Sequence, residues 1–189
     1  MDEAAGLSIA YDEHDDVREI ADRIQYCVES ISLAFDGWDE PRMRGPGLYF
    51  VIVAGTSVAD YADPMGANRW PVEECRSVTA DLDEFFDAAS DVAVHCDGAV
   101  IVSVDGTILP QMVRMKDLTG EERAATADEQ LDYADWMGAR HMSAIDTSVR
   151  DEVVFAITLS EETGRVTVFQ DGEYEDWSRE QLGAPWRND

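Results

Sequence analysis

Three short stretches of the sequence carry residue types that handle phosphate groups and metal ions. Asp97-Gly98-Ala99 places a carboxylate and a glycine within an apolar run, and Arg140-His141 follows Gly138 near the expected start of a helix. Ser160-Glu161-Glu162 follows the apolar segment 153–159. An arginine at a helix N-terminus can clamp phosphate oxygens, and carboxylates are ligands that Mg²⁺ and Mn²⁺ prefer. These residue types point to a site for a phosphate-bearing substrate and a divalent metal.

Each stretch also has a purely structural explanation when it is taken alone. Asp97-Gly98 is a common sequence for a turn or a bulge, because glycine weakens the interior of a strand. Arg140-His141 can be a solvated helix start, and the residues from Ser160 to Gly164 can be an ordinary hairpin connection. His95 by itself is more often a core histidine than a metal ligand. The order and spacing of the stretches, rather than any one of them, favour a functional site.

The chain is strongly acidic. Of its 189 residues, 41 are Asp or Glu and 14 are Lys or Arg, which gives a formal net charge of -27. Such a charge opposes compaction through self-repulsion, and salt relieves the repulsion because the Debye length is only about 3 Å at ~1 M. We therefore expect adaptation to a salt-rich cytoplasm, with an acidic protein of a low-salt organism as the alternative. The same charge predicts no nucleic-acid partner, since that binding needs clustered Lys and Arg.

The sequence carries no pattern typical of membrane insertion or export. No apolar run approaches the ~20 residues that a membrane-spanning helix needs. The segment Met1-Asp2-Glu3 lacks the basic and apolar parts of a signal peptide. Cys27, Cys75 and Cys96 have no metal-type spacing, so we expect reduced and mostly buried thiols. These features predict a cytoplasmic protein with no membrane partner.

Apolar periodicity predicts the elements that must position the three stretches. Helical spacing predicts helices over 17–35, capped by Asp15 and Asp16, and over 80–89 and 139–149. Short continuous apolar runs are typical of strands that are covered on both faces. Helices that alternate with such strands predict a single-domain α/β fold, a mixed β-sheet flanked by helices on both faces.

The remaining expectations concern the strands and the weakly patterned segments. Strands are predicted over 48–54, 153–159 and 165–169, and a hairpin is predicted over 92–109 with its turn at Asp105-Gly106. Residues 56–79 are predicted to be a loop, the pattern fades between 110 and 135 apart from a short helix, and the tail with Trp177 and Trp186 is predicted to form a short helix.

Together the three stretches resemble the diadenylate cyclase domain of the DisA and CdaA type. That family carries an Asp-Gly-Ala motif in a strand hairpin, then an Arg-His-Arg motif, then a Ser-Glu-Glu-Thr-Gly turn after the next strand. This chain has Asp97-Gly98-Ala99, Gly138-Ala139-Arg140-His141 and Ser160-Glu161-Glu162-Thr163-Gly164 in the same order. With the acidic composition, the resemblance implies a stand-alone haloarchaeal member. It divides the chain into an N-terminal helix and connection (1–46), a cyclase-like domain (47–172) and a tail (173–189).

The resemblance implies an activity and a set of catalytic residues. Two ATP molecules would be condensed into cyclic di-AMP with release of two pyrophosphates, at a site formed between facing subunits of a homo-oligomer. Asp97 would orient or activate the ribose 3′-hydroxyl, and Gly98 and Ala99 would let the backbone approach the nucleotide. Arg140 and His141 would hold the phosphates of the leaving group.

The resemblance also implies substrate and metal ligands. Ser143, Ser160 and Glu161 would bind the substrate ATP. Glu162, His95 and Asp97 would hold a divalent cofactor metal, Mn²⁺ or Mg²⁺, which a chain of charge -27 needs in order to approach a triphosphate.

One position departs from the family pattern. Met142 stands where the family has its second arginine, so a cation expected near the triphosphate is missing. Either Arg140, the metal and the partner subunit suffice for turnover, or the chain is a catalytically weak or silent nucleotide-binding regulator of the same fold. An acidic interaction domain without a ligand is the more distant alternative.

Overall fold

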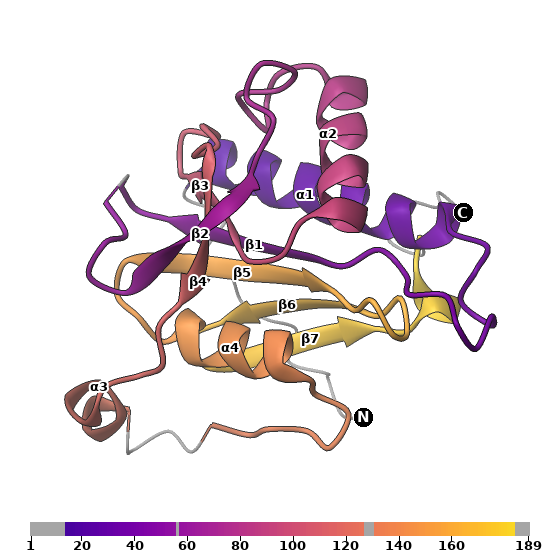
Figure 1. Cartoon of the computed structure of the whole chain (residues 1–189). Coiled ribbons are helices and arrows are strands. Elements are labelled where there is room, and N and C mark those ends of the chain that lie inside the picture. The colour runs from indigo at the N-terminus through magenta and orange to yellow at the C-terminus, as the bar shows by residue number, and fades with distance from the viewer. Residues whose placement is uncertain (1–13, 56, 127–130, 184–189) are drawn as a thin grey trace.

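The apolar run that begins at Leu48 forms the strand around which the fold is arranged (Figure 1). The computed structural model describes residues 14–55, 57–126 and 131–183. The helices in these residues are α1 (Asp15–Ala34), α2 (Leu82–His95), α3 (Gly120–Ala125) and α4 (Ala139–Ser148), and Arg179–Gln181 form a 3-10 turn. The strands are β1 (Leu48–Val53), β2 (Ala62–Arg69), β3 (Val100–Ser103), β4 (Gln111–Met115), β5 (Val153–Leu159), β6 (Val166–Gln170) and β7 (Glu173–Trp177).

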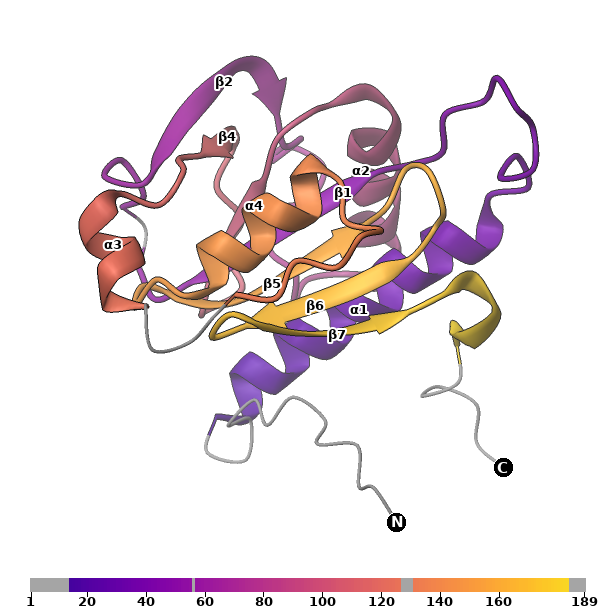
Figure 2. The ribbon, with the colours of Figure 1, turned by 90° about the horizontal axis from the view of Figure 1, so that it is seen from below.

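Five of these strands form one mixed sheet in the order β3-β1-β5-β6-β7. β1 and β3 run parallel, and the other neighbours in this sheet are antiparallel. β2 and β4 form a separate antiparallel pair, which an isolated bridge between Ala99 and Val113 joins to the main sheet. Helices α1 and α2 cover one face of the main sheet and α4 covers the other (Figure 2). The predicted fold class, a mixed sheet with helices on both faces, is confirmed.

The position of β1 inside the sheet explains why its sequence is apolar throughout. Leu48, Phe50 and Ile52 pack toward α1 and α2, whereas Tyr49 and Val51 pack toward α4. Successive side chains of a strand point to opposite faces, and both faces of this strand are covered. The predicted strands over 48–54, 153–159 and 165–169 all appear, within one residue at each end.

The predicted first and third helices appear as α1 and α4. The predicted side-chain cap of α1 by Asp15 and Asp16 is wrong, because His14 occupies the cap position and both aspartates lie in the first turn. There their negative charge favours the positive end of the helix dipole. In the part of the chain that the structure describes, no helix is long and apolar enough to cross a membrane.

The predicted hairpin over 92–109 is wrong at its start, because α2 continues to His95. Val92 and Ala93 are buried in the helical stripe that includes Phe85 and Ala89, so the apolar residues before Cys96 belong to helix packing. The hairpin begins instead with β3 and turns at Asp105-Gly106, as predicted, where Thr107 N–H donates to an Asp105 carboxylate oxygen at 2.9 Å.

Three strands of the structure were not predicted from the sequence. β2 lies in the expected loop and contains Pro64 and Gly66, and β4 lies where the apolar pattern fades. β7 occupies the start of the expected tail helix and forms an edge of the main sheet, where it pairs with β6 among the described strands. Only a 3-10 turn, Arg179–Gln181, follows it in the described part of the tail. The predicted short helix between 110 and 135 is confirmed as α3. Trp186 lies outside the described residues.

Candidate active site

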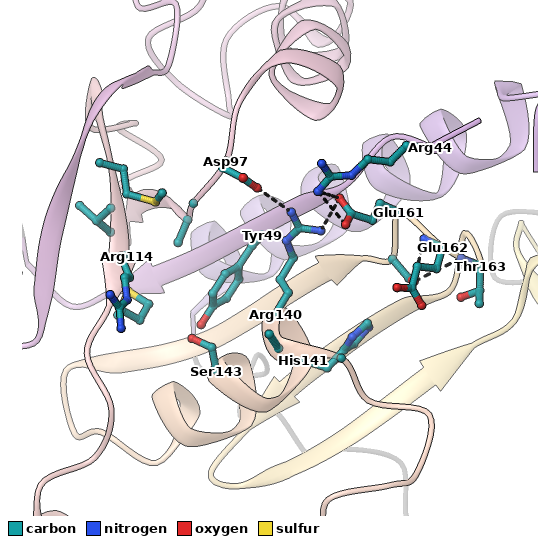
Figure 3. Close-up of a pocket in the computed structure, with 18 of the residues that line it drawn as sticks. Arg44, Tyr49, Asp97, Arg114, Arg140, His141, Ser143, Glu161, Glu162 and Thr163 are labelled. Atoms are coloured by element: carbon teal, nitrogen blue, oxygen red, sulfur yellow. Dashed lines mark hydrogen bonds and ion pairs between the residues drawn. The ribbon is translucent and has the colours of Figure 1, made fainter. Parts of the chain in front are cut away.

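The three predicted stretches line one pocket of about 570 Å³ (Figure 3). Asp97, Gly98 and Ala99 come from the segment between α2 and β3, and Arg140, His141 and Ser143 come from the first turns of α4. Ser160, Glu161 and Glu162 come from the turn between β5 and β6. The sheet order explains this meeting, because β1 lies between β3 and β5 and α4 crosses the same face.

Asp97-Gly98-Ala99 enters β3 from a loop rather than interrupting a strand. Ala99 exchanges both backbone hydrogen bonds with Val113, at 2.7 and 3.0 Å. Gly98 has a φ of +100°, and an added Cβ would lie 2.6 Å from the Met65 sulfur and 2.9 Å from the Val113 carbonyl oxygen. Only glycine fits this conformation and this close approach. The Asp97 amide donates to Asn68 at 2.8 Å.

Arg140 lies at the centre of the pocket between two carboxylates. Its Nη2 lies 3.4 Å from Asp97 Oδ1, and its Nη1 lies 3.5 Å from Glu161 Oε2. Its side chain is 18% exposed, whereas the Asp97 side chain is 60% exposed. Gly47 makes room for the guanidinium, because a Cβ there would lie 2.6 Å from Arg140 Nη1. Arg140 therefore joins the first and third predicted stretches.

His141 is buried behind Arg140 among aromatic rings. Its imidazole meets the Trp136 ring edge-on at a centroid distance of 5.1 Å, and Phe169 lies 6.3 Å away. Burial, together with the positive charges of Arg140 and Arg165, lowers the pKa of His141 to about 4. The ring is therefore neutral near pH 7. Its buried Nε2 has no hydrogen-bond partner among the described residues.

The turn after β5 presents Ser160 and Glu161 to the pocket. The Ser160 amide donates to the Arg165 carbonyl at 2.9 Å, and the Ser160 hydroxyl accepts the Glu162 and Thr163 amides at 3.4 and 3.3 Å. Because these bonds use the oxygen as an acceptor, the hydroxyl proton is left to donate into the pocket.

The wall of the pocket beside Ser143 is formed by the buried phenol of Tyr49. Burial raises the pKa of Tyr49 to about 12, although the neighbouring hydroxyls of Thr147 and Ser143 oppose the shift. Figure 3 shows the Tyr49 and Ser143 oxygens facing each other at the first turns of α4. Tyr49 is therefore a neutral hydroxyl and not an anion at any pH near 7.

The structure does not bring the three predicted metal ligands together. His95 is the last residue of α2, and its exposed ring contacts Asp91 one turn earlier at 3.0 Å. It faces a smaller neighbouring hollow of about 300 Å³ that Asp97 also lines, whereas Glu162 lies beside Thr163 (Figure 3). Within the described ranges no group of three or more His, Cys, Asp or Glu side chains could hold a metal ion.

A family model described as "DisA bacterial checkpoint controller nucleotide-binding", abbreviated DAC, matches residues 47–174. The chain belongs to the DAC family. Every predicted site residue falls inside this matched segment.

Two solved structures are similar to this DAC chain. One is a double mutant of DacA from Staphylococcus aureus, with 19% sequence identity and a TM-score of 0.48, covering 94% of this chain and 99% of that chain. The other is a hypothetical membrane spanning protein from Bacillus cereus, with 16% identity and a TM-score of 0.48, covering 84% of this chain and 63% of that chain. No curated protein matches the sequence.

Met142, the departure from the DAC pattern, does not line the pocket. It follows His141 on α4, and it is 45% exposed. The pocket of this chain therefore obtains its positive charge from other positions.

Besides the predicted Arg140, the lining contains two arginines and one aromatic ring that sequence reasoning missed. Arg44 and Arg114 line the pocket, and so does Trp136. Arg44 lies in a connection rich in Gly and Pro, and Arg114 lies on a strand without an apolar pattern, so neither carried a signal. Trp136 lies two residues before the Gly138-Ala139-Arg140 motif. A large aromatic residue so close to a candidate site was the one signal in the sequence that could have indicated its place in the pocket.

Proposed function

We propose that the protein is a diadenylate cyclase, which condenses two ATP into cyclic di-AMP and two pyrophosphates. One observation carries this proposal: three stretches far apart in the sequence converge on one pocket, with Arg140 within 3.5 Å of both Asp97 and Glu161. The arrangement offers a carboxylate, a guanidinium and a hydroxyl to one ligand. Membership in a family described as nucleotide-binding supports a nucleotide as that ligand.

The reaction requires two nucleotides to face each other. The 3′-hydroxyl oxygen of each ATP attacks the α-phosphorus of the other, a P–O bond forms, and the bond to the leaving pyrophosphate breaks. The hydroxyl proton leaves to a base or to solvent. Two such exchanges close the ring and release two pyrophosphates. Because one chain offers one pocket, we infer a homo-oligomer in which two pockets face each other and hold the reactants in line.

The residues of the pocket divide this work. The exposed carboxylate of Asp97 orients or deprotonates the ribose 3′-hydroxyl, while Gly98 and Ala99 leave room for the sugar. Arg140 and Ser160 neutralise and bind the phosphates, and such positioning and charge neutralisation dominate phosphoryl transfer. The N–H group of neutral His141 can donate a hydrogen bond to a phosphate oxygen without adding charge.

A divalent metal fits this site only in part. Sites for Mg²⁺ at nucleotides commonly use one or two carboxylates together with phosphate oxygens, and Asp97 offers one exposed carboxylate at the pocket. Asp97 would therefore hold Mn²⁺ or Mg²⁺ together with the substrate, and Glu162 and His95 are not gathered around it. When bound, the metal would neutralise phosphate charge in a strongly acidic protein.

A nucleotide-binding regulator of the same fold is the second candidate. Met142 favours it, because the cation that the family carries at this position is missing. Such a regulator would bind ATP in the pocket and release no cyclic product.

Product analysis separates the two candidates. We propose a salt-rich cytoplasm as the setting, on the basis of the charge of -27, so the purified protein is incubated with ATP and Mn²⁺ or Mg²⁺ at molar salt. A cyclase yields cyclic di-AMP and pyrophosphate in a ratio of one to two. ATP binding without either product identifies the regulator, and no binding at all contradicts both.

A further inference from the structure

Arg44 lies outside the segment that matches the DAC family, yet it lines the pocket. It belongs to the connection between α1 and β1, close to the start of the matched segment at residue 47. Its Nη2 lies 2.6 Å from Glu161 Oε2 and donates to Glu161 Oε1 at 2.7 Å. One guanidinium nitrogen thus contacts both carboxylate oxygens, and the same guanidinium can instead bind the oxygens of a phosphate group.

The backbone that carries Arg44 is fixed by hydrogen bonds to the turn after β5 and to α2. The Gly45 amide donates to the Glu161 carbonyl at 3.0 Å, and the Gly47 amide donates to the Ala93 carbonyl at 2.9 Å. Gly45 also lies so close to Trp38 that a Cβ would approach the ring within 2.1 Å. The Arg44 side chain, in contrast, is 67% exposed. An anchored backbone and a solvated side chain allow the guanidinium to change partners without moving the chain.

Glu161 holds both arginines of this end of the pocket. Its Oε2 lies 2.6 Å from Arg44 Nη2 and 3.5 Å from Arg140 Nη1. Figure 3 shows the two guanidinium groups side by side at this carboxylate, with Arg114 at the opposite end of the pocket. A polyphosphate that reaches this end would meet two guanidinium groups, of which the exposed one can leave its carboxylate at little cost.

The charge balance of the pocket makes the guanidinium of Arg44 important for phosphate binding. Among the described lining residues are three arginines and four carboxylates, so the pocket without substrate carries no surplus of positive charge. A nucleoside triphosphate therefore depends on the few cations that reach its phosphates. Met142 supplies no cation, because its side chain is uncharged, and it does not line the pocket.

We propose that Arg44 is a phosphate-binding residue of this pocket, which pairs with Glu161 in the free protein and turns to the terminal phosphates of the nucleotide. This proposal rests on the proposed function, since it assigns Arg44 to the same nucleotide site. It makes the connection before β1 a part of the binding site.

The test compares nucleotide binding by four proteins at one salt concentration. Wild type, Arg44→Ala, Arg44→Lys and Arg42→Ala are titrated calorimetrically with a non-hydrolysable ATP analogue and with AMP. Arg42 is the matched control, because it is exposed on the same connection, is not part of the pocket lining, and its removal changes the net charge equally. Thermal unfolding of each variant reports its folding separately.

We expect Arg44→Ala to bind the ATP analogue at least about tenfold more weakly than Arg42→Ala, as the loss of a charged hydrogen bond predicts. AMP binding should change by less than about twofold, because only a screened charge is lost. The affinity of Arg44→Lys for the ATP analogue should lie between those of wild type and Arg44→Ala, since lysine keeps the charge but lacks the planar guanidinium group. Equal affinities of Arg44→Ala and Arg42→Ala would overturn the role of Arg44 alone. A folded wild type that binds neither nucleotide would overturn the proposed function as well.

Discussion

The buried imidazole of His141 makes the stability of this protein depend on pH. In the fold its pKa falls to about 4, mainly through burial and further through Arg140 and Arg165, from the ordinary value of 6.5. Between these two values the unfolded chain binds a proton at this residue and the folded protein does not. Unfolding is therefore favoured as the pH falls through this window, and the stabilisation is complete only above about pH 6.5.

The size of this effect follows from the two pKa values. Within the window, each pH unit changes the free energy of unfolding by about 1.4 kcal/mol per proton. Going from about pH 7 to about pH 5, the proton taken up by the unfolded chain lowers the free energy of unfolding by about 2 kcal/mol. His141→Gln removes this contribution and leaves a polar side chain at the same place.

The measurement is urea unfolding of both proteins at fixed salt, at several values between about pH 7 and about pH 5. Carboxylates titrate in the same range, so the informative quantity is the difference between wild type and His141→Gln. We expect this difference to shrink by about 2 kcal/mol as the pH falls. His95→Gln is the control, because that ring is exposed, and it should follow the wild-type curve. Parallel curves for wild type and His141→Gln would refute the buried neutral imidazole.

Two further substitutions test other parts of the site. Arg140→Ala should weaken ATP binding at least about tenfold, because a guanidinium that is 18% exposed between Asp97 and Glu161 is lost; an unchanged affinity by calorimetry would remove Arg140 from the binding site. Gly98→Ala should lower the free energy of unfolding by about 1–3 kcal/mol, because its φ is +100° and a Cβ would lie 2.6 Å from the Met65 sulfur. Gly120→Ala is its control, with open space around the added Cβ, and equal unfolding curves for the two variants would contradict the strain at Gly98.

The strands β1 and β5 at the middle of the main sheet could be predicted because their signal is local and unambiguous. β1 and β5 are continuous apolar runs, and burial on both faces of one sheet explains them fully. β2 and β4 could not be predicted in the same way. They pair directly with each other in a separate two-stranded sheet, and their sequences show no alternation, so their pairing depends on tertiary context.

The site residues likewise divide into those that local sequence predicts and those that it does not. The residues in motifs meet as expected, since Asp97, Arg140 and Glu161 lie within contact distance in the fold. His95 was assigned to the wrong kind of element, because an apolar run at the end of α2 looks like the start of a strand. Arg44 had no local signal, since its place in the pocket depends on long-range hydrogen bonds of the connection to Glu161 and Ala93.

Formation of cyclic di-AMP by wild type and by Asp97→Asn tests directly whether the pocket is a diadenylate cyclase site. Both proteins are incubated with ATP and Mn²⁺ or Mg²⁺ at molar salt, with ATP affinity and unfolding measured in parallel. Because the Asp97 side chain is 60% exposed and its ion pair in the described part of the chain is with Arg140, the variant should fold normally. We expect cyclic di-AMP and pyrophosphate from wild type and none from Asp97→Asn. Equal product from both proteins, or ATP binding by wild type without product, would contradict it.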